Sequence, residues 1–372
     1  MTVESKKKHD VKKIMSQFDI PGDFVAAAPY GSGHINDTYA AVTDQGGTSV
    51  RYIVQRINHF VFKNPPALME NIERVTKHIH EKIKNDPHST RHVLTLLPTL
   101  DGKCWFQDRD GNYWRIYIFV ENTKSYDVIE NSEQAFQGAK AFGEFQKDLV
   151  DLPGKRLNDT IPDFHNTPQR FRNLEKAVKD DVKNRAKSVK KEIDFIFSRK
   201  DVTEKLLNLS AQGLVPERVT HNDTKLNNVL FDEKTGEGRC VIDLDTVMPG
   251  LALYDFGDLI RTGTSPAAED ERELSKVRMQ MDKYDALVKG YLTSAKDFLT
   301  KSEVDNLAFS GKLITLEIGM RFLTDHLSGD VYFKIHREGH NLDRCRTQLR
   351  LVECIEELED EMNAIAANFR KK

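Results

Sequence analysis

The stretch His-Asn-Asp-Thr-Lys-Leu-Asn-Asn at positions 221–228 says more about the fold than any other part of this 372-residue chain. Asp223 and Asn228 stand five residues apart in it, in the order H-x-D-x-x-x-x-N. A second segment, Ile-Asp-Leu-Asp at 242–245, follows a short apolar run that predicts a buried strand. A loop with this spacing, followed by a separate acidic residue, is the arrangement that kinase-fold enzymes use for phosphoryl transfer.

Each of these residue types suits that chemistry. Phosphoryl transfer passes through a loose transition state, so the protein mainly positions the acceptor hydroxyl and neutralises charge on the phosphate. Asp223 is the predicted catalytic base, because a carboxylate can orient the hydroxyl and accept its proton late. Asn228 and Asp243 offer the hard oxygen atoms that Mg²⁺ prefers. Clusters of Asp and Asn also occur in turns, but four residue types matching in order and spacing favour a site.

Two neighbouring features are predicted to support this loop. His221 is expected to orient it through a backbone hydrogen bond, since phosphoryl transfer leaves the imidazole no evident proton to move. The segment Tyr-Asp-Phe-Gly-Asp at 254–258 lies near an expected helix start. A carboxylate there can cap backbone N–H groups and brace the loop.

Upstream, residues 30–39 contain a short glycine-bearing turn between two strand-like segments. Glycine lets the backbone approach a phosphate closely, and exposed N–H groups form a concavity that binds anions. A plain hairpin turn fits the same residues. The predicted phosphate-binding residues are Gly31, Ser32, Gly33 and His34.

The following strand-like segment, 51–56, lacks the lysine that a kinase carries there. Gln55 stands at the expected place, with Arg56 beside it. Arg56 is the candidate replacement, and an ordinary surface arginine is the alternative. Glu73, in a helical pattern of apolar residues, is the candidate ion-pair partner.

Residues 114–121 form an apolar run that ends in a polar turn. A strand that leads into a linker can offer backbone groups to an adenine, so Phe119 and Glu121 are predicted nucleotide contacts. Beyond residue 130 helical periodicity dominates. The prediction is an α+β, bilobal, protein-kinase-like fold. Its small N-terminal lobe (1–120) contains an antiparallel sheet and binds nucleotide, and its larger, mainly helical C-terminal lobe (121–372) carries catalysis and substrate binding. The two lobes are expected to close on both ligands.

Together these segments resemble the aminoglycoside phosphotransferase and choline kinase superfamily, and most closely its N-acetylhexosamine 1-kinases. The resemblance extends from about residue 30 to residue 351. It implies ATP-dependent, Mg²⁺-assisted phosphorylation of the anomeric hydroxyl of N-acetylglucosamine or N-acetylgalactosamine, giving the sugar 1-phosphate. The segments that carry it are 31–39, 219–230, 241–258 and 320–323.

The resemblance also implies residue roles. The catalytic aspartate and the magnesium ligands of the family match the residues assigned above, and Asp223 would also contact the substrate. Arg321 and Tyr332 match positions used around the sugar, whose hydroxyl pairs suit a forked guanidinium. Without the resemblance, Arg321 fits an ion pair with Asp325 four residues on, and Tyr332 fits a half-buried core position.

Two other interpretations stay open. A kinase of the same fold could phosphorylate choline, homoserine, methylthioribose or an aminoglycoside. A cationic acceptor favours nearby acids and aromatic rings, and acids are present at 269–271 and 273, where the first turn of a helix is an alternative explanation. The second interpretation is a non-catalytic pseudokinase, suggested by Gln55.

Composition constrains the setting. The formal charge of −3, from 55 basic and 58 acidic residues, argues against a nucleic-acid-binding surface. The four cysteines show no C-x-x-C spacing and fit a reducing cytoplasm. A signal-peptide pattern and a membrane-spanning apolar run are both missing. We therefore expect a cytoplasmic enzyme that binds a small sugar and ATP, without nucleic-acid or membrane partners and with no indication of its oligomeric state.

Overall fold

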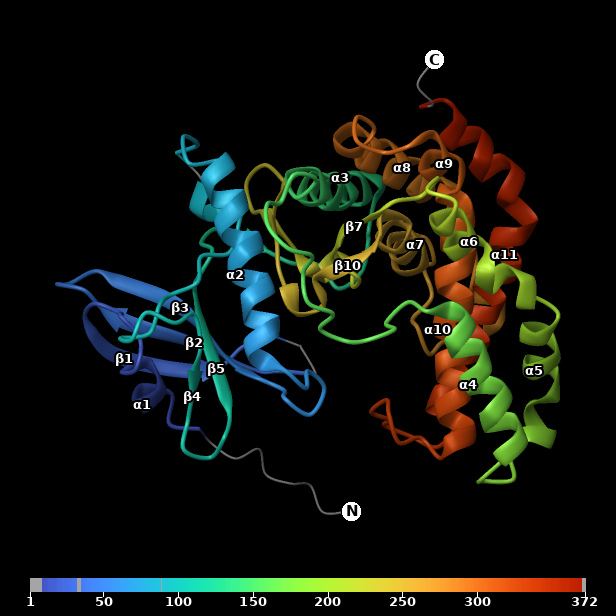
Figure 1. Cartoon of the computed structure of the whole chain (residues 1–372), viewed down its shortest axis with the longest axis horizontal. Coiled ribbons are helices and arrows are strands. Elements are labelled where there is room, and N and C mark those ends of the chain that lie inside the picture. Colours follow the sequence, from blue (N-terminus) through green and yellow to red (C-terminus); the bar gives the residue numbers. More distant parts are fainter. Residues whose placement is uncertain (1–8, 32–34, 88, 370–372) are drawn as a thin grey trace. The chain divides into compact units, whose positions relative to one another are not determined.

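The computed structural model describes residues 9–31, 35–87 and 89–369, and the chain divides into two compact units (Figure 1). The first unit contains Met1–Thr123 and Gly154–Ile161. The second contains Lys124–Pro153 and Pro162–Lys372.

A five-stranded antiparallel sheet in the order β1-β2-β3-β5-β4 forms the centre of the first unit. Successive side chains of a strand point to opposite faces, and Tyr52, Val54, Trp114 and Ile116 lie together in an apolar core on one face. The strands are β1 (Asp23–Pro29), β2 (Asp37–Asp44), β3 (Ser49–Ile57), β4 (Phe106–Gln107) and β5 (Tyr113–Ile118).

Two helices accompany this sheet. The short helix α1 (Val11–Met15) contributes its apolar residues to the core just described. Helix α2 (Pro65–Lys82) begins where the side chain of Asn64 accepts a hydrogen bond from the backbone N–H of Ala67, and proline occupies its first turn. The apolar side chains that predicted this helix are buried, as expected for an amphipathic helix: Leu68, Ile72, Val75 and Ile79.

The segment Gly154–Ile161 belongs to the first unit because it is bonded to α2. The backbone N–H of Asn158 donates to Oδ1 of Asn71 at 2.9 Å, and Nδ2 of Asn71 donates to the carbonyl of Asn158 at 2.8 Å. Arg74 adds a hydrogen bond to the carbonyl of Lys155 at 2.7 Å. Each of these contacts involves a backbone group of the 154–161 segment, so the pattern of apolar side chains in the sequence does not predict them.

The second unit is mainly helical. Helices α4, α5, α10 and α11 lie side by side in Figure 1 and share one apolar core. Together with the sheet of the first unit, this confirms the predicted fold class. The helices are α3 (Ser132–Asp148), α4 (Thr167–Asp180), α5 (Lys190–Phe197), α6 (Lys205–Ala211), α7 (Ala252–Gly263), α8 (Met281–Ala295), α9 (Lys301–Asp305), α10 (Leu307–Ser328) and α11 (His340–Ala367).

Short strands complete the second unit. β7 (Glu217–Thr220) pairs with β10 (Met248–Leu251), and β8 (Val229–Asp232) pairs with β9 (Gly238–Val241), both antiparallel. The two-residue strand β6 (Thr123–Lys124) lies where the chain passes between the units. The loop 221–228 therefore runs from β7 to β8, and α7 follows directly after β10.

Helix α7 packs tightly against α10 at a glycine. A Cβ atom at Gly257 would lie 2.4 Å from the carbonyl oxygen of Ser310, which is closer than atoms can approach. Glycine is therefore required there for the two helices to approach this closely. This packing holds the first turns of α7, which carry the acidic residues next to the 221–228 loop.

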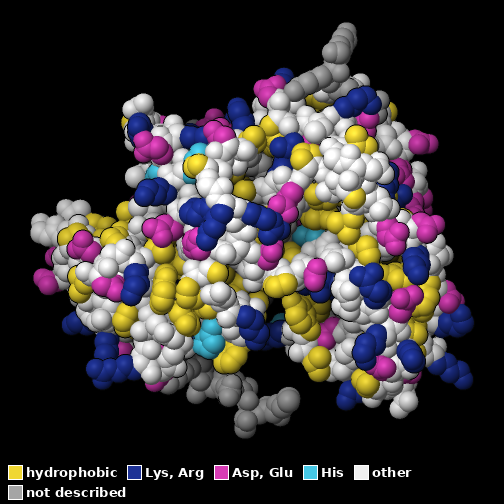
Figure 2. Space-filling view, viewed as in Figure 1, with side chains coloured by type: hydrophobic (Ala, Val, Ile, Leu, Met, Phe, Trp, Pro, Cys, Tyr) yellow, Lys and Arg dark blue, Asp and Glu magenta, His cyan; other side chains and the backbone are white. Residues whose placement is uncertain are grey.

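Charged side chains of both signs are interspersed over the face drawn in Figure 2, which agrees with the nearly balanced formal charge. Among the described residues, no helix is long and apolar enough to cross a membrane. The four cysteines are free thiols.

Candidate active site

The loop 221–228 is held from inside by its own side chains. Asn222 adopts a left-handed backbone conformation, φ 64°, which asparagine tolerates better than most residues. Its Nδ2 atom donates to the carbonyl of Thr246 at 2.9 Å. The ring of His221 donates from Nε2 to the carbonyl of Ile242 at 2.9 Å and accepts at Nδ1 from the N–H of Asp223 at 3.3 Å. The predicted orienting role of His221 is confirmed.

Helix α7 braces the same loop through two of its carboxylates, as predicted. The carboxylate of Asp255 accepts from the N–H groups of His221 at 2.9 Å and Asn222 at 2.7 Å, and from Nε2 of Gln146 at 2.5 Å. Burial raises the pKa of Asp255, and these donors oppose the rise. Asp258 adds a bond from the N–H of Thr224 at 3.0 Å.

Asp223 lies in a positively charged environment. The Nζ atom of Lys225 is 3.0 Å from the Oδ1 atom of Asp223. The side chain of Asp223 is 27% exposed. Burial acts to raise the pKa of Asp223, but the positive charges of Lys225, His221 and Arg261 together outweigh that effect and the pKa is lowered. The carboxylate is therefore ionised at neutral pH and able to orient a hydroxyl. Lys225 lies within the motif, but its spacing there does not point to this role.

The backbone brings the segments of the two predicted magnesium ligands together. The N–H of Ile242 donates to the carbonyl of Asn228 at 2.9 Å, which brings Asn228 next to the start of the 242–245 segment. Nδ2 of Asn228 donates to the carbonyl and to Oδ2 of Asp223, at 2.8 and 3.1 Å. The amide oxygen of Asn228 is thus the atom suited to a cation, and Asp243 follows β9 in a left-handed conformation, φ 59°.

This donor set fits Mg²⁺. Magnesium keeps several waters and binds one or two protein oxygens together with substrate phosphates, so it does not need a cage of protein ligands. In the described part of the chain, no three His, Cys, Asp or Glu side chains form a metal-binding group. A neighbouring amide oxygen and carboxylate are what a Mg²⁺–nucleotide site requires of the protein.

In the first unit, the position without a lysine is occupied by a bonded network. Nε2 of Gln55 donates to Oγ1 of Thr38 at 3.0 Å, and its Oε1 atom accepts from Nε of Arg115 at 3.0 Å. Arg115 stands directly opposite Gln55 on β5 and is almost fully buried. The cation at this place in the sheet therefore comes from the neighbouring strand.

The expected ion pair between Arg56 and Glu73 is wrong. Nε of Arg56 donates to Oδ2 of Asp37 at 2.8 Å, because these residues face each other across β2 and β3. Glu73 instead accepts from the thiol of Cys104 at 3.4 Å. Burial, followed by the carboxylate of Glu73, raises the pKa of that thiol to about 12.

The predicted nucleotide contacts lie partly in one cluster. The rings of Tyr30 and Phe119 are 5.6 Å apart, and the guanidinium of Arg51 lies 3.9 Å from the centre of the Phe119 ring. The carboxylate of Glu121 pairs with Arg51. Gly31, next to Tyr30, has φ +77°, a value that suits glycine. The other three predicted phosphate-binding residues, Ser32, Gly33 and His34, lie outside the described residues.

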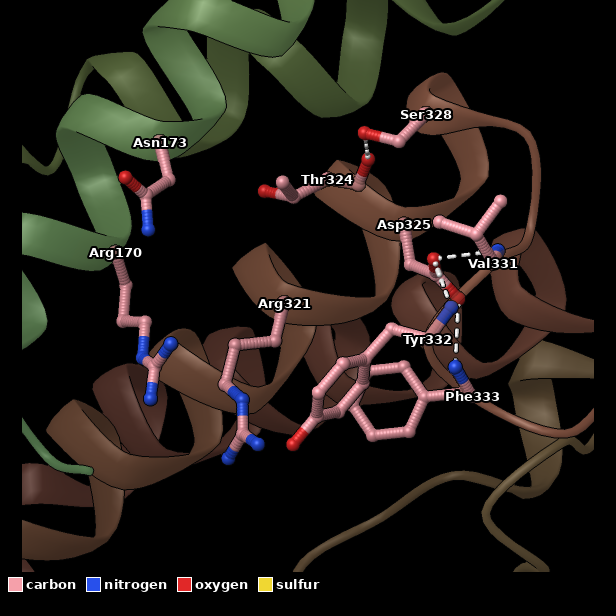
Figure 3. A pocket seen from close by; sticks show the side chains of 9 residues that line it. All are labelled: Arg170, Asn173, Arg321, Thr324, Asp325, Ser328, Val331, Tyr332 and Phe333. Atoms are coloured by element: carbon pink, nitrogen blue, oxygen red, sulfur yellow. Dashed lines mark hydrogen bonds between the residues drawn. The ribbon is translucent and has the colours of Figure 1, made fainter. Parts of the chain in front are cut away.

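Arg321 and Tyr332 line one cavity of about 190 Å³ in the second unit (Figure 3). The guanidinium of Arg321 lies 5.9 Å from the Tyr332 ring centre and 5.6 Å from that of Phe333. Tyr332 is 64% exposed, so the half-buried core alternative is wrong. Arg170 of α4 also lines the cavity, a residue to which no sequence pattern pointed.

The alternative ion pair between Arg321 and Asp325 is not formed among the described residues. The carboxylate of Asp325 accepts instead from the backbone N–H groups of Val331, Tyr332 and Phe333, at 2.9, 2.8 and 2.9 Å. These bonds fix the loop after α10 so that its aromatic rings stand beside Arg321 (Figure 3).

Comparison with known proteins agrees with this geometry. A model of the phosphotransferase enzyme family matches residues 26–282. The chain belongs to this family, in agreement with the sequence-based prediction of a phosphotransferase.

Solved structures of low sequence identity share the fold. An aminoglycoside phosphotransferase from Alicyclobacillus acidocaldarius has a TM-score of 0.63 and 12% identity, covering 97% of this chain and 98% of its own. A microcompartment-associated aminopropanol kinase has a TM-score of 0.55 and 14% identity, covering 95% and 98%. The choline kinase of Streptococcus pneumoniae has a TM-score of 0.52 and 12% identity, covering 93% and 98%.

Proposed function

We propose that this protein transfers the γ-phosphoryl group of ATP to the anomeric hydroxyl of an N-acetylhexosamine, either N-acetylglucosamine or N-acetylgalactosamine. The observation that carries the proposal is the cavity in which Arg321 and Tyr332 meet. A forked guanidinium can donate to two neighbouring hydroxyls, and the aromatic rings offer an apolar wall to a sugar ring and its acetyl group.

The loop residues have distinct roles in this proposal. Asp223 orients the anomeric hydroxyl and accepts its proton, and Lys225 keeps that carboxylate ionised. Asn228 and Asp243 hold Mg²⁺, which when bound neutralises charge on the transferred phosphoryl group. His221 and Asp255 keep the loop in shape and touch no substrate.

Nucleotide binding is assigned to the N-terminal lobe, residues 1–120, and catalysis and acceptor binding to residues 121–372. Backbone groups of the turn that begins at Gly31 would face the phosphates, and the segment from Phe119 to Glu121 would meet the adenine. Arg56 remains the proposed cationic contact, although it is already paired with Asp37. That pair makes Arg56 the least supported of the nucleotide contacts.

The charges of the second unit support a neutral acceptor over a cationic one. Arginines line the cavity, and like charge repels a choline or an aminoglycoside. The acids that would favour such a cation are engaged elsewhere: Glu269 pairs with Arg261 at 3.0 Å, and Asp270 pairs with Arg337 at 3.1 Å. They do not form the first turn of an α-helix, so that alternative is wrong.

The size of the cavity favours a small acceptor. At about 190 Å³ it lies below the ~300–1,000 Å³ typical of pockets for drug-sized ligands. A single sugar ring suits this space better than the several linked rings of an aminoglycoside.

An ADP-release assay with Mg-ATP and a panel of acceptors tests the proposal. The panel contains N-acetylglucosamine, N-acetylgalactosamine, glucose, galactose, choline, homoserine, methylthioribose and an aminoglycoside, and phosphorus NMR locates the phosphate on the product. We expect turnover confined to the two N-acetylhexosamines, with phosphate on the anomeric carbon. Turnover of a different alcohol would replace the proposed acceptor, and no ADP release with any acceptor would favour a pseudokinase.

A further inference from the structure

Two guanidinium groups share the cavity beside α10. Arg170 projects from α4 and Arg321 from α10, and Figure 3 shows both side chains extending toward the same end of the cavity. The charge of Arg321 is close enough to add to the effect of burial in lowering the pKa of Arg170. Two like charges are therefore held together at one place.

The carboxylate of Glu317 acts on both guanidinium groups through space, without a direct ion pair. Within the described ranges, neither Arg170 nor Arg321 forms an ion pair with a carboxylate. Arg170 donates from one terminal nitrogen to the carbonyl of Phe164 at 2.9 Å, while its Nε atom is buried without a hydrogen-bond partner. Arg321 packs against aromatic rings, including that of Phe164 at 5.3 Å. Several N–H donors thus remain available.

Two acids of α10, Asp325 and Glu317, accept hydrogen bonds from other donors. Asp325 accepts three backbone N–H groups, as described above, and a fourth bond from Nδ2 of Asn341 at 2.9 Å. Glu317, one helical turn before Arg321, is fully buried and accepts from His165 at 2.9 Å and from the hydroxyl of Thr167 at 2.5 Å. These bonds engage both carboxylates, and neither of them pairs directly with Arg170 or Arg321 among the described residues.

We propose that Arg170 and Arg321 together bind an oxyanion, either a carboxylate, a sulfate or a phosphate. Forked guanidinium donors match the oxygen geometry of these groups, and the terminal nitrogens of both arginines can supply charge-assisted bonds. The anion would also reduce the mutual repulsion of the two arginines, which the carboxylates of Glu317 and Asp163 oppose without a direct ion pair.

The anion can come from two sources. It can be a free ion, or it can be a substituent of the acceptor, in which case the inference rests on the proposed function and extends it to anionic N-acetylhexosamines. Arg170 then acts as a specificity residue that the neutral sugars do not require. The experiment separates these two sources.

Direct binding of inorganic sulfate is the first measurement, by calorimetry and by thermal unfolding of the full chain against sodium chloride at equal ionic strength. We expect sulfate to bind and to raise the Tm beyond the effect of chloride. Arg170→Gln and Arg321→Gln each raise the sulfate Kd by about tenfold or more, since each removes charge-assisted hydrogen bonds. Arg170→Lys keeps the positive charge but loses the forked donor geometry of the guanidinium, so its sulfate Kd is expected to lie between those of the wild type and Arg170→Gln.

Arg172→Gln is the matched control. Arg172 lies on the same helix, is exposed, and bonds only to the side chain of Gln169 among the contacts described. Its loss removes the same charge outside the cavity, and sulfate binding is expected to stay unchanged. Sulfate binding that persists in both cavity variants, or falls equally in Arg172→Gln, overturns the proposal, as does the absence of a sulfate effect in the wild type.

A kinetic comparison identifies the source of the anion. N-acetylglucosamine 6-phosphate and N-acetylglucosamine serve as competing acceptors. A higher kcat/KM for the anionic sugar, lost in Arg170→Gln, supports the substituent. Inhibition by free sulfate that is competitive with the neutral sugar, with no preference for the anionic sugar, supports the free ion. If no sugar is turned over while sulfate still depends on Arg170, the anion site stands and the proposed function fails.

Discussion

The Nδ1 atom of His165 lies 2.9 Å from the Oε1 atom of Glu317, and both side chains are shielded from solvent. This bond joins the segment before α4 to the middle of α10. The His165 ring also lies 4.9 Å from that of Tyr254, the residue before Asp255 on α7. His165 therefore contacts both α10, which lines the cavity, and α7, which braces the 221–228 loop.

Glu317→Gln is expected to weaken the dependence of stability on acid pH. Burial acts to raise the pKa of Glu317, but His165, Arg321 and the hydroxyl of Thr167 together outweigh burial and the pKa is lowered from 4.5. A lowered folded-state pKa gives stability that is present above about pH 4.5 and is lost as pH falls through the folded-state value. Denaturant unfolding between pH 3 and pH 7 measures this slope, which the variant flattens.

Glu303→Gln does not serve as the control for that experiment, because Glu303 pairs with Arg218. Glu175→Gln, at a half-exposed position on α4, removes a carboxylate with only a distant lysine contact of 3.9 Å. Its pH slope is expected to match the wild type. An unchanged slope in Glu317→Gln would show that the bond with His165 contributes no pH-dependent stability.

Lys225→Met is expected to move the acid limb of the kcat profile to higher pH. Without the ammonium, His221 and Arg261 alone oppose the effect of burial on Asp223, so the pKa of its carboxyl rises and the proposed base is protonated at a pH where the wild type is ionised. Steady-state rates from pH 5 to pH 9 measure the shift. Lys234→Met, at an exposed turn position, is the control, and coincident acid limbs in all three proteins would refute the role of Lys225.

Asp255→Ala is expected to lower the free energy of unfolding by about 2–4 kcal/mol, because buried N–H groups of the loop lose their acceptor. Asp255→Asn preserves the volume but cannot accept from both N–H groups with the same geometry, so it destabilises as well. Asp285→Ala removes an exposed pair with Lys289 and changes stability by less than about 0.5 kcal/mol. Equal effects at 255 and 285 would contradict the bracing role.

Asp223→Asn and Asp243→Ala are expected to fail in different ways. Loss of the base lowers kcat by about 10²–10⁴-fold while nucleotide affinity is largely retained. Asp243→Ala also weakens binding of the Mg²⁺–nucleotide complex, since it removes a proposed metal ligand. Calorimetry of nucleotide binding with and without Mg²⁺ separates the two, and near-normal kcat in Asp223→Asn would refute the catalytic assignment.

Arg321→Ala is expected to raise the KM of the sugar by about tenfold or more and the KM of ATP much less, because in the proposed function the lost donors bind the acceptor. The same measurements on Arg172→Ala show how far the loss of a surface arginine of this unit changes the two KM values. Equal increases in both KM values for Arg321→Ala would indicate a general structural defect and remove the sugar contact.

The parts that could be predicted from sequence are those set by neighbours along the chain. The β7–β8 loop, the orienting role of His221 and the cap supplied by Asp255 all depend on short spacings between residue types whose chemistry is specific. The helical stripes beyond residue 130 were predictable for the same reason, since one apolar face repeats with the period of the helix.

The parts that could not be predicted depend on pairing across space. Arg56 faces Asp37 because of the register between β2 and β3, which no motif records. Arg170 reaches the cavity only because α4 packs on α10, and its own surroundings in the sequence are those of a surface helix. The roles of the individual site residues remain predictions for the experiments above.

The hydrogen bonds between Asn71 and Asn158 determine how the chain can be divided into fragments. Because Gly154–Ile161 completes the first unit, the chain passes between the units three times, after residues 123, 153 and 161. A fragment ending at Thr123 would leave Asn71 and Arg74 of α2 without the backbone partners described above. Expressing the units separately therefore requires a graft or co-expression of the 154–161 peptide, and one proteolytic cut cannot release either unit whole.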